Sequence, residues 1–185
     1  MNIIETRLTG VLLIEPKVFG DSRGFFLETF AEARYERAGI RGPFVQDNMS
    51  KSARGILRGL HLQNPQMQGK LVWVVQGSVL DVAVDVRVGS PTFGQSVAEE
   101  LSEENKRQLW IPPGFAHGFC VTSENAVFVY KCTDYYAPEK EVGVAWDDPD
   151  LGIPWPIREP MISAKDRAHP RLKDIDPARL PRYAT

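Results

Sequence analysis

The chain has 185 residues, which is enough for one domain with a substantial core and short for two ordinary domains. Its 22 basic and 24 acidic residues nearly cancel, and the net charge of -2 argues against a nucleic-acid or membrane-surface protein. No early apolar run has the basic flank and cleavage site of a secretion leader, and no run approaches the ~20 apolar residues of a membrane helix, so we expect neither. We therefore expect a single cytoplasmic domain over residues 1–185, with Cys120 and Cys132 as buried free thiols.

The first forty residues alternate short β-rich runs with turns. LTGVLLIEPKVF is followed by the turn Gly20–Gly24 and by FFLETF, a pattern that predicts a hairpin. Residues 31–39, AEARYERAG, predict a short helix because Gly39 stands where a helix stops. Further on, Leu57–Gln63 and a run that begins at Lys70, KLVWVV, predict two strands separated by the turn Asn64-Pro65.

The second half of the chain is also rich in β signals. In VLDVAVDVRV, Leu80, Val82, Val84 and Val86 share one face and Asp81, Ala83 and Asp85 the other, which predicts a half-buried strand. Short strands recur at spacings near ten residues, and SEENKRQ fits a turn between two of them better than a helix. We expect an all-β sandwich or barrel, wrapped by a polar tail over about residues 147–185 that ends in a short helix.

Arg58, His61 and Lys70 fall inside these apolar strands. A strand interior is a costly place for such groups unless they are paired or face a wet cavity, so they are candidates for a binding or catalytic pocket. Solvated surface residues and a structural ion-pair network are the alternatives. Strict alternation puts Arg58 and His61 on opposite faces of their strand, and a bulge at Gly59 would bring both inward.

A second constellation is the stretch WIPPGFAHGF, residues 110–119, in which a stiff Pro-Pro-Gly turn precedes His117. Together with residues 55–61 it resembles the two sequence motifs of cupin barrels. Many cupins bind a metal through a His-x-His pair, but the first motif here is His61-Leu62-Gln63. The chain has only three histidines and His169 lies in the polar tail, so we expect no metal site of the common His-rich kind.

Across nearly the whole chain, the resemblance is to the dTDP-4-dehydrorhamnose 3,5-epimerase family. The motifs that carry it occur in the family's order: RGFFLETF, QDNMS, GILRGLHLQ, QGKLVWVVQGSVLDVAVDVR, WIPPGFAHGF, VYKCTDYYAPEKE and WDDPDLGIPWP. The resemblance implies a cupin-like double-stranded β-helix (jelly roll) with a few short helices, working as a homodimer without a cofactor. It implies inversion of C3 and C5 of dTDP-4-dehydro-6-deoxy-D-glucose in dTDP-L-rhamnose biosynthesis.

The resemblance also assigns roles to residues. His61 would be the base, Asp166 its orienting carboxylate, Tyr130 the proton donor on the opposite ring face, and Lys70 the cation that stabilises the enolate oxygen at C4. Without the resemblance, Tyr130 reads as a core tyrosine and Asp166 as a local cap, whereas His61 and Lys70 remain candidates.

Substrate binding is assigned partly from residue chemistry and partly from the resemblance. Arg23 and Arg58 offer planar donors for two phosphates. The resemblance places an amino-terminal strand carrying Arg23, Phe26 and Glu28 in the partner's site. Glu28, Gln46 and Asn48 can address nucleotide or sugar edges, and His117 the sugar or phosphate. By resemblance, Glu141 and Lys165 match substrate-contact positions. The aromatic pair alone suggests that Tyr136 or Tyr135 stacks on the thymine. The alternative for these residues is a solvated surface.

Three other functions remain open at this stage. A relative that inverts only one carbon, or that moves the ketone, would use the same barrel. Two alternatives come from other functional classes: a metal-dependent cupin oxygenase and a non-catalytic module that binds a sugar nucleotide. Solvent-deuterium exchange into the sugar separates the enzyme from the binding module, and metal analysis separates the oxygenase.

Overall fold

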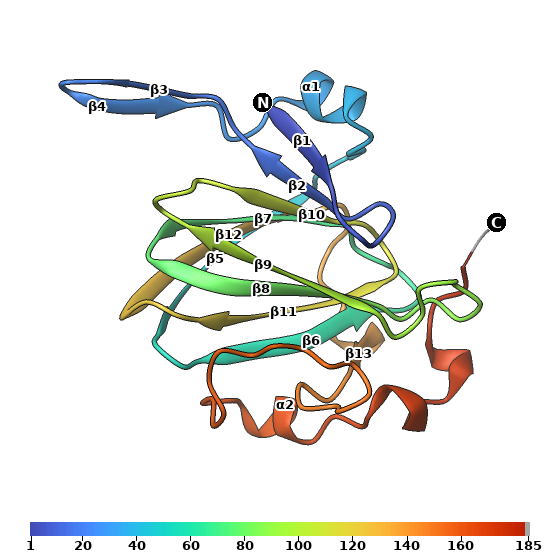
Figure 1. The fold of residues 1–185 in the computed structure, drawn as a ribbon. Helices are drawn as coiled ribbons and strands as arrows, with labels where there is room; N and C mark the ends of the chain where they lie inside the picture. The colour runs from blue at the N-terminus through green and yellow to red at the C-terminus, as the bar shows by residue number, and fades with distance from the viewer. Residues whose placement is uncertain (184–185) are drawn as a thin grey trace.

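The computed structural model describes residues 1–183 and consists mainly of two β-sheets packed face to face, with a long hairpin that projects from one end (Figure 1). The last two residues of the predicted tail, 184–185, lie outside the described residues. One sheet has six strands in the order β1-β2-β10-β7-β12-β5, and the other has five in the order β13-β6-β11-β8-β9. The predicted all-β jelly roll is confirmed.

The strands of the six-stranded sheet are β1 (Asn2–Glu5), β2 (Leu12–Glu15), β5 (Gln46–Ala53), β7 (Lys70–Gln76), β10 (Gln108–Ile111) and β12 (Asn125–Cys132). Those of the five-stranded sheet are β6 (Leu57–Gln63), β8 (Ser78–Asp85), β9 (Ser96–Ser102), β11 (Phe115–Val121) and β13 (Glu141–Gly143). The helices are α1 (Glu32–Arg37) and α2 (Ala164–Arg167), with 3₁₀ turns at Pro138–Lys140, Leu172–Asp174 and Pro177–Arg179. None of the helices within residues 1–183 is long and apolar enough to cross a membrane.

Several local predictions are confirmed. The amino-terminal hairpin pairs β3 (Val18–Asp21) with β4 (Gly24–Leu27), and it extends away from the sheets as an arm (Figure 1). Helix α1 ends just before Gly39, whose φ of +84° is easy only for glycine. SEENKRQ is a turn, in which the Asn105 side chain accepts hydrogen bonds from the Ser102 and Arg107 amides.

The main core fills the space between the two sheets. Apolar side chains from alternate positions of both sheets meet there, as the period of a strand requires, and they include Val72, Leu109, Phe128, Val79 and Phe119. Cys120 and Cys132, on β11 and β12, are both buried free thiols.

The prediction that residues 79–88 form a half-buried strand is wrong, because both faces of β8 are covered. Its inward face carries Asp81 and Asp85, whose side chains are fully buried. Its other face packs Val82 and Val84 against a second cluster that includes Leu172, Ile175 and Leu180 of the tail. The tail therefore seals the outer face of the five-stranded sheet. It does not simply end in a helix, since Arg182 follows the last 3₁₀ turn and bridges to Val88.

Candidate active site

A cavity of about 590 Å³ opens between the two sheets and is closed on one side by the tail. Most of the predicted catalytic and binding side chains that lie on the barrel line it. Its lining residues include Arg58, His61, Lys70, His117, Tyr130, Tyr136, Glu141, Lys165 and Asp166. A smaller cavity of about 210 Å³ shares His61, Lys70 and Tyr130 with it and adds Gln46 and Asn48. The size and mixed lining suit a small organic ligand that carries polar groups.

His61 and Asp166 form a dyad although 105 residues separate them in the sequence. His61 Nε2 lies 2.8 Å from Asp166 Oδ1, and the Gly59 amide donates to Asp166 Oδ2 at 3.3 Å. Burial alone would raise the pKa of Asp166, but these hydrogen bonds lower it below the usual range. The carboxylate therefore accepts the proton of Nε2, which leaves Nδ1 of the neutral ring as the free proton acceptor.

Ser163 fixes the position of Asp166. Its side chain caps helix α2 by accepting from the Asp166 amide at 3.0 Å. Asp166 thus lies in the first turn of this short helix, with its side chain turned toward β6 and away from solvent. The alternative in which Asp166 merely caps the tail does not hold, because its carboxylate accepts from His61 and Gly59 while Ser163 provides the cap.

The bulge expected at Gly59 is present. β11 pairs His117 with His61 and Phe119 with Arg58, so three steps along β6 match two along β11. Gly59 has a φ of +118°, and a Cβ there would lie 2.6 Å from the Gly118 Cα, so no larger residue fits. As a result, Arg58 and His61 line the same cavity instead of facing opposite sides of the sheet.

Lys70 and Tyr130 come from the sheet opposite His61. Burial lowers the pKa of Lys70. The charges of Cys132, Asp81 and Glu141 act to raise this pKa, but burial outweighs them. Lys70 makes no salt bridge with any residue that the structure describes. A cation held this way gains most from a ligand that brings or develops negative charge. Burial also raises the pKa of Tyr130, so its hydroxyl stays protonated at neutral pH.

His117 is paired with a residue that the sequence analysis did not single out as functional. Its Nε2 lies 3.0 Å from Oδ2 of Asp81, a fully buried carboxylate on the neighbouring strand β8. Burial lowers the pKa of His117, although Asp81 opposes the shift. A signal was present in the sequence, since an aspartate alternating with valines in a strand needs a partner once the strand is buried.

The remaining pocket residues form a hydrogen-bonded wall. Gln46 donates to Asn48 at 3.0 Å and accepts from the Tyr136 amide at 2.9 Å. Glu141 accepts from the Tyr136 hydroxyl at 3.1 Å and pairs with Lys165 at 2.6 Å. Tyr136, one of the two tyrosines considered for stacking on the thymine, lines both cavities.

Arg23, Phe26 and Glu28 are not brought to this pocket. Arg23 lies in the turn of the arm and pairs with Asp21 at 2.5 Å, with its side chain 88% exposed. Phe26 on β4 is 69% exposed. Glu28, just after β4, pairs with Arg34 of helix α1. Within residues 1–183, then, the arm contributes none of these three residues to the cavity of its own chain.

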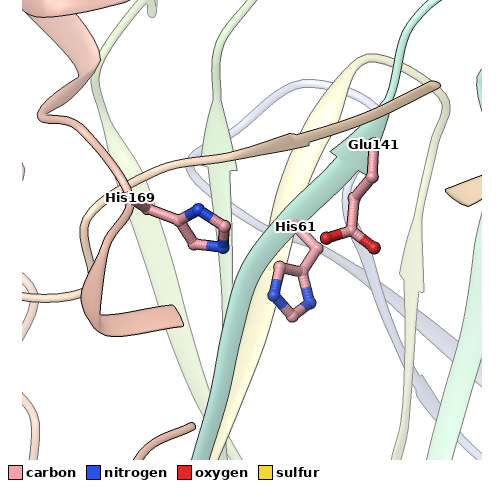
Figure 2. Close-up of side chains that lie close together, drawn as sticks. All are labelled: His61, Glu141 and His169. Carbon is pink, nitrogen blue, oxygen red and sulfur yellow. The ribbon is translucent and has the colours of Figure 1, made fainter. Parts of the chain in front are cut away.

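His169 lies in the tail, as expected, but it was not among the expected site residues. The tail brings its ring against that of His61 edge to face, with ring centroids 5.5 Å apart, close to Glu141 (Figure 2). No local sequence pattern predicts this contact, because it depends on how the tail folds back over β6. His169 follows Asp166 by one helical turn and arrives at the site with it.

Comparison with known proteins supports one family. The family model for dTDP-4-dehydrorhamnose 3,5-epimerase matches residues 5–174. The chain is 56% identical over 178 residues to the dTDP-4-dehydrorhamnose 3,5-epimerase of Pseudomonas aeruginosa, which covers 95% of this chain and 98% of the relative. The chain belongs to the dTDP-4-dehydrorhamnose 3,5-epimerase family. It is accordingly an enzyme, an isomerase that acts on a carbohydrate.

Solved structures agree with the family. The dTDP-6-deoxy-D-glucose-3,5-epimerase of Legionella pneumophila, in complex with dTDP-4-keto-L-rhamnose, superposes with a TM-score of 0.97 at 56% identity and covers 100% of this chain and 99% of that one. A 3'-monoepimerase of Streptomyces bikiniensis, in complex with dTDP-quinovose, has a TM-score of 0.91 at 37% identity over 96% and 92% of the two chains. The same fold therefore serves enzymes named for one inversion and for two.

Proposed function

We propose that this epimerase inverts C3 and C5 of dTDP-4-dehydro-6-deoxy-D-glucose, giving dTDP-4-dehydro-L-rhamnose for dTDP-L-rhamnose biosynthesis. The observation that carries the proposal is the His61–Asp166 contact of 2.8 Å in the wall of a cavity that also holds Lys70 and Tyr130. A base, an unpaired cation and a protonated hydroxyl are the groups that an epimerisation next to a ketone requires.

The first half of each inversion is removal of a proton. The ketone at C4 acidifies the hydrogens at C3 and C5, and Nδ1 of His61 takes one of them. The carbon–hydrogen electron pair forms a carbon–carbon double bond to C4, and the π pair of the C4 carbonyl moves to its oxygen, which gives the enolate. Lys70 stabilises the negative charge on that oxygen, and Asp166 stabilises the imidazolium that forms.

The second half returns a proton to the opposite ring face. His61 lies on β6 of the five-stranded sheet, and Tyr130 on β12 of the six-stranded sheet, so the two groups approach the cavity from facing sheets. Tyr130 donates its hydroxyl proton to the carbon as the enolate collapses to the ketone. Exchange with solvent then reprotonates Tyr130 and deprotonates His61, and no cofactor is consumed in the cycle.

The substrate is held by polar groups around this centre. Arg58, whose guanidinium donates to Ser52 at 3.2 Å, binds a phosphate, and His117 binds the sugar or the phosphate. Tyr136 stacks on the thymine, bordered by Gln46 and Asn48. Glu141 and Lys165 contact the substrate from the other side of the same wall.

The enzyme acts as a homodimer in which each arm enters the partner's site. Support comes from the arm itself, which projects from the sheets and exposes Phe25 and Phe26 at 61% and 69%, more apolar surface than a lone hairpin normally leaves in water (Figure 1). In this arrangement Arg23 binds the substrate's diphosphate across the two-fold axis, with Phe26 and Glu28 beside it. We further propose that residues 1–185 form one domain, and that the buried free thiols reflect a reducing, cytoplasmic setting.

Incubation of the 4-keto sugar with the protein in deuterated water tests the proposal. Deuterium at both C3 and C5 of an L-rhamno-configured product is the expected result. Label and inversion at one carbon only would make the chain a monoepimerase. Binding of the nucleotide sugar without any label would contradict the proposal.

A further inference from the structure

Three side chains with metal-binding atoms meet beside the dyad. His61, Glu141 and His169 each offer one ligand atom, and these atoms all lie within 4.8 Å of one another (Figure 2). They come from β6, from the start of β13 and from the tail just after α2. The set differs from the two barrel motifs, because it uses His169 and Glu141 instead of His117. It is called the lateral triad below.

The ring of His169 is held in place by the strand behind it. A Cβ on Gly143 would lie 2.2–2.3 Å from three ring atoms, so the absence of a side chain there makes room for the imidazole. Gly143 is paired with His61 across β13 and β6, which sets the two histidines against each other. Nε2 of His169 is buried and has no hydrogen bond to any group within the described residues, since Asp166 Oδ1 at 3.6 Å is too far.

Glu141 supplies the anionic member of the triad. Its Oε1 lies 2.6 Å from the Lys165 ammonium, and its other oxygen accepts from Tyr136. The Glu141 side chain is only 11% exposed, whereas that of Lys165 is 58% exposed. Lys165 can therefore swing into solvent and leave the carboxylate oxygen to another cation.

We propose that the lateral triad is a binding site for a divalent transition metal of the zinc type, and that metal bound there takes His61 out of catalysis. Two imidazoles and one carboxylate are a donor set that proteins use for zinc. Ligands of a tetrahedral zinc stand ~3.3 Å apart, so atoms within 4.8 Å of one another need to approach by at most on the order of 1.5 Å. Side-chain rotation of Glu141 and small ring movements achieve that.

The dyad favours this binding mode. A metal-bound histidine usually donates its other ring N–H to a carboxylate, and Asp166 already accepts from Nε2 of His61. The metal would then occupy Nδ1, the proton-accepting nitrogen. If it bound Nε2 instead, it would displace Asp166. Either way the base is lost, and this inhibitory consequence rests on the proposed function, whereas the metal site itself does not.

Cobalt(II) is the probe for the site, because tetrahedral Co²⁺ absorbs in the visible and zinc displaces it. Titration of the purified wild-type protein should give one bound Co²⁺ per chain, with absorption bands that zinc abolishes. His169→Phe keeps a ring over Gly143 but removes the nitrogen, so it should weaken Co²⁺ binding by at least about tenfold. Glu139→Gln removes an exposed carboxylate next to the triad and should bind Co²⁺ as the wild type does. His169→Gln serves as the second variant, and circular dichroism checks the fold of each.

Activity gives an independent readout. Zinc should lower the wild-type epimerisation rate by at least about tenfold, a chelator should restore it, and His169→Phe should keep more than about half of its own metal-free rate at the same zinc concentration. Because both proteins meet the same substrate, zinc chelation by the diphosphate cancels in the comparison. Absence of one-to-one Co²⁺ binding, or equal binding by folded His169 variants, would overturn the proposal. Metal binding by a chain without epimerase activity would instead contradict the proposed function alone.

Discussion

Replacing Asp166 by asparagine isolates what the dyad contributes. The substitution keeps the size and planarity of the side chain but removes its charge. In the wild type the buried carboxylate accepts from His61 at 2.8 Å and from the Gly59 amide at 3.3 Å. These two bonds end on different oxygens, and asparagine has only one oxygen, so its side chain can accept the bond from His61 or the bond from Gly59 but not both. Circular dichroism therefore checks that the variant keeps its fold. In the proposed mechanism, what disappears is the charge that stabilises the imidazolium formed when His61 accepts a proton.

The expected loss of rate follows from the hydrogen bond between Asp166 and His61. A hydrogen bond to a charged group contributes about 1.5–3 kcal/mol, and each 1.36 kcal/mol is tenfold in rate. Asp166→Asn should therefore lower kcat by roughly tenfold to 150-fold, with a much smaller change in KM because the bond strengthens in the transition state. The difference in the free energy of unfolding between the wild type and Asp166→Asn should depend on pH. Folding lowers the pKa of Asp166, so the carboxylate stabilises the folded wild type at neutral pH, and this stabilisation is lost as pH falls through the lowered pKa.

The assay is the rate of deuterium incorporation at C3 and C5 with saturating substrate, followed by NMR. Asp81→Asn is the matched control, because Asp81 is also a buried carboxylate and pairs with the other pocket histidine, His117, at 3.0 Å. We expect this control to raise KM and to change the exchange rate at saturation by only a few-fold. An Asp166→Asn enzyme with the wild-type kcat, or a control that loses exchange equally, would refute the assigned role of the dyad.

Three further predictions concern other parts of the molecule. Tyr130→Phe should still incorporate solvent deuterium at one or more of the carbons C3 and C5 but form far less inverted product. A wild-type yield of doubly inverted sugar would show that Tyr130 is only a core residue. Burial raises the pKa of Tyr35 to about 12, above the ~10 of an unfolded tyrosine, so about 3 kcal/mol of stability should be lost in total as pH rises from below 10 to above 12; denaturant midpoints of Tyr35→Phe should lack this part of the loss. Mixed dimers of Arg23→Ala and Lys70→Ala should recover activity, because one of the two sites then holds both intact residues; no recovery after subunit exchange would place Arg23 in its own chain's site.

The parts of the fold that sequence predicted well are those with local signals. The bounds of Leu57–Gln63 and the start of the next strand at Lys70 follow from β-rich runs that are broken by a turn. The bulge at Gly59 also followed, because two polar side chains three residues apart can share a face only if the strand gains a residue. Likewise, His61 and Lys70 were suspect from residue type alone, since ionisable groups in apolar strands require a partner or a cavity.

The parts that local signals missed depend on the tail. β8 has the alternation of a half-buried strand, but tail residues cover its outer face, which no pattern within the strand records. Asp166 was assigned to the site by family resemblance only, and His169 was not among the expected site residues. Both reach His61 through a contact that spans more than a hundred residues, where short-range periodicity carries no information.

The measurement that tests the account most directly is solvent-deuterium exchange by His61→Asn. Asparagine keeps a polar group in the pocket but cannot serve as the base at neutral pH. With dTDP-4-dehydro-6-deoxy-D-glucose in deuterated water, we predict that incorporation at both C3 and C5 collapses while the variant still binds the nucleotide. Exchange at either carbon at the wild-type rate would contradict the account, because the proton would then be removed by a group other than His61.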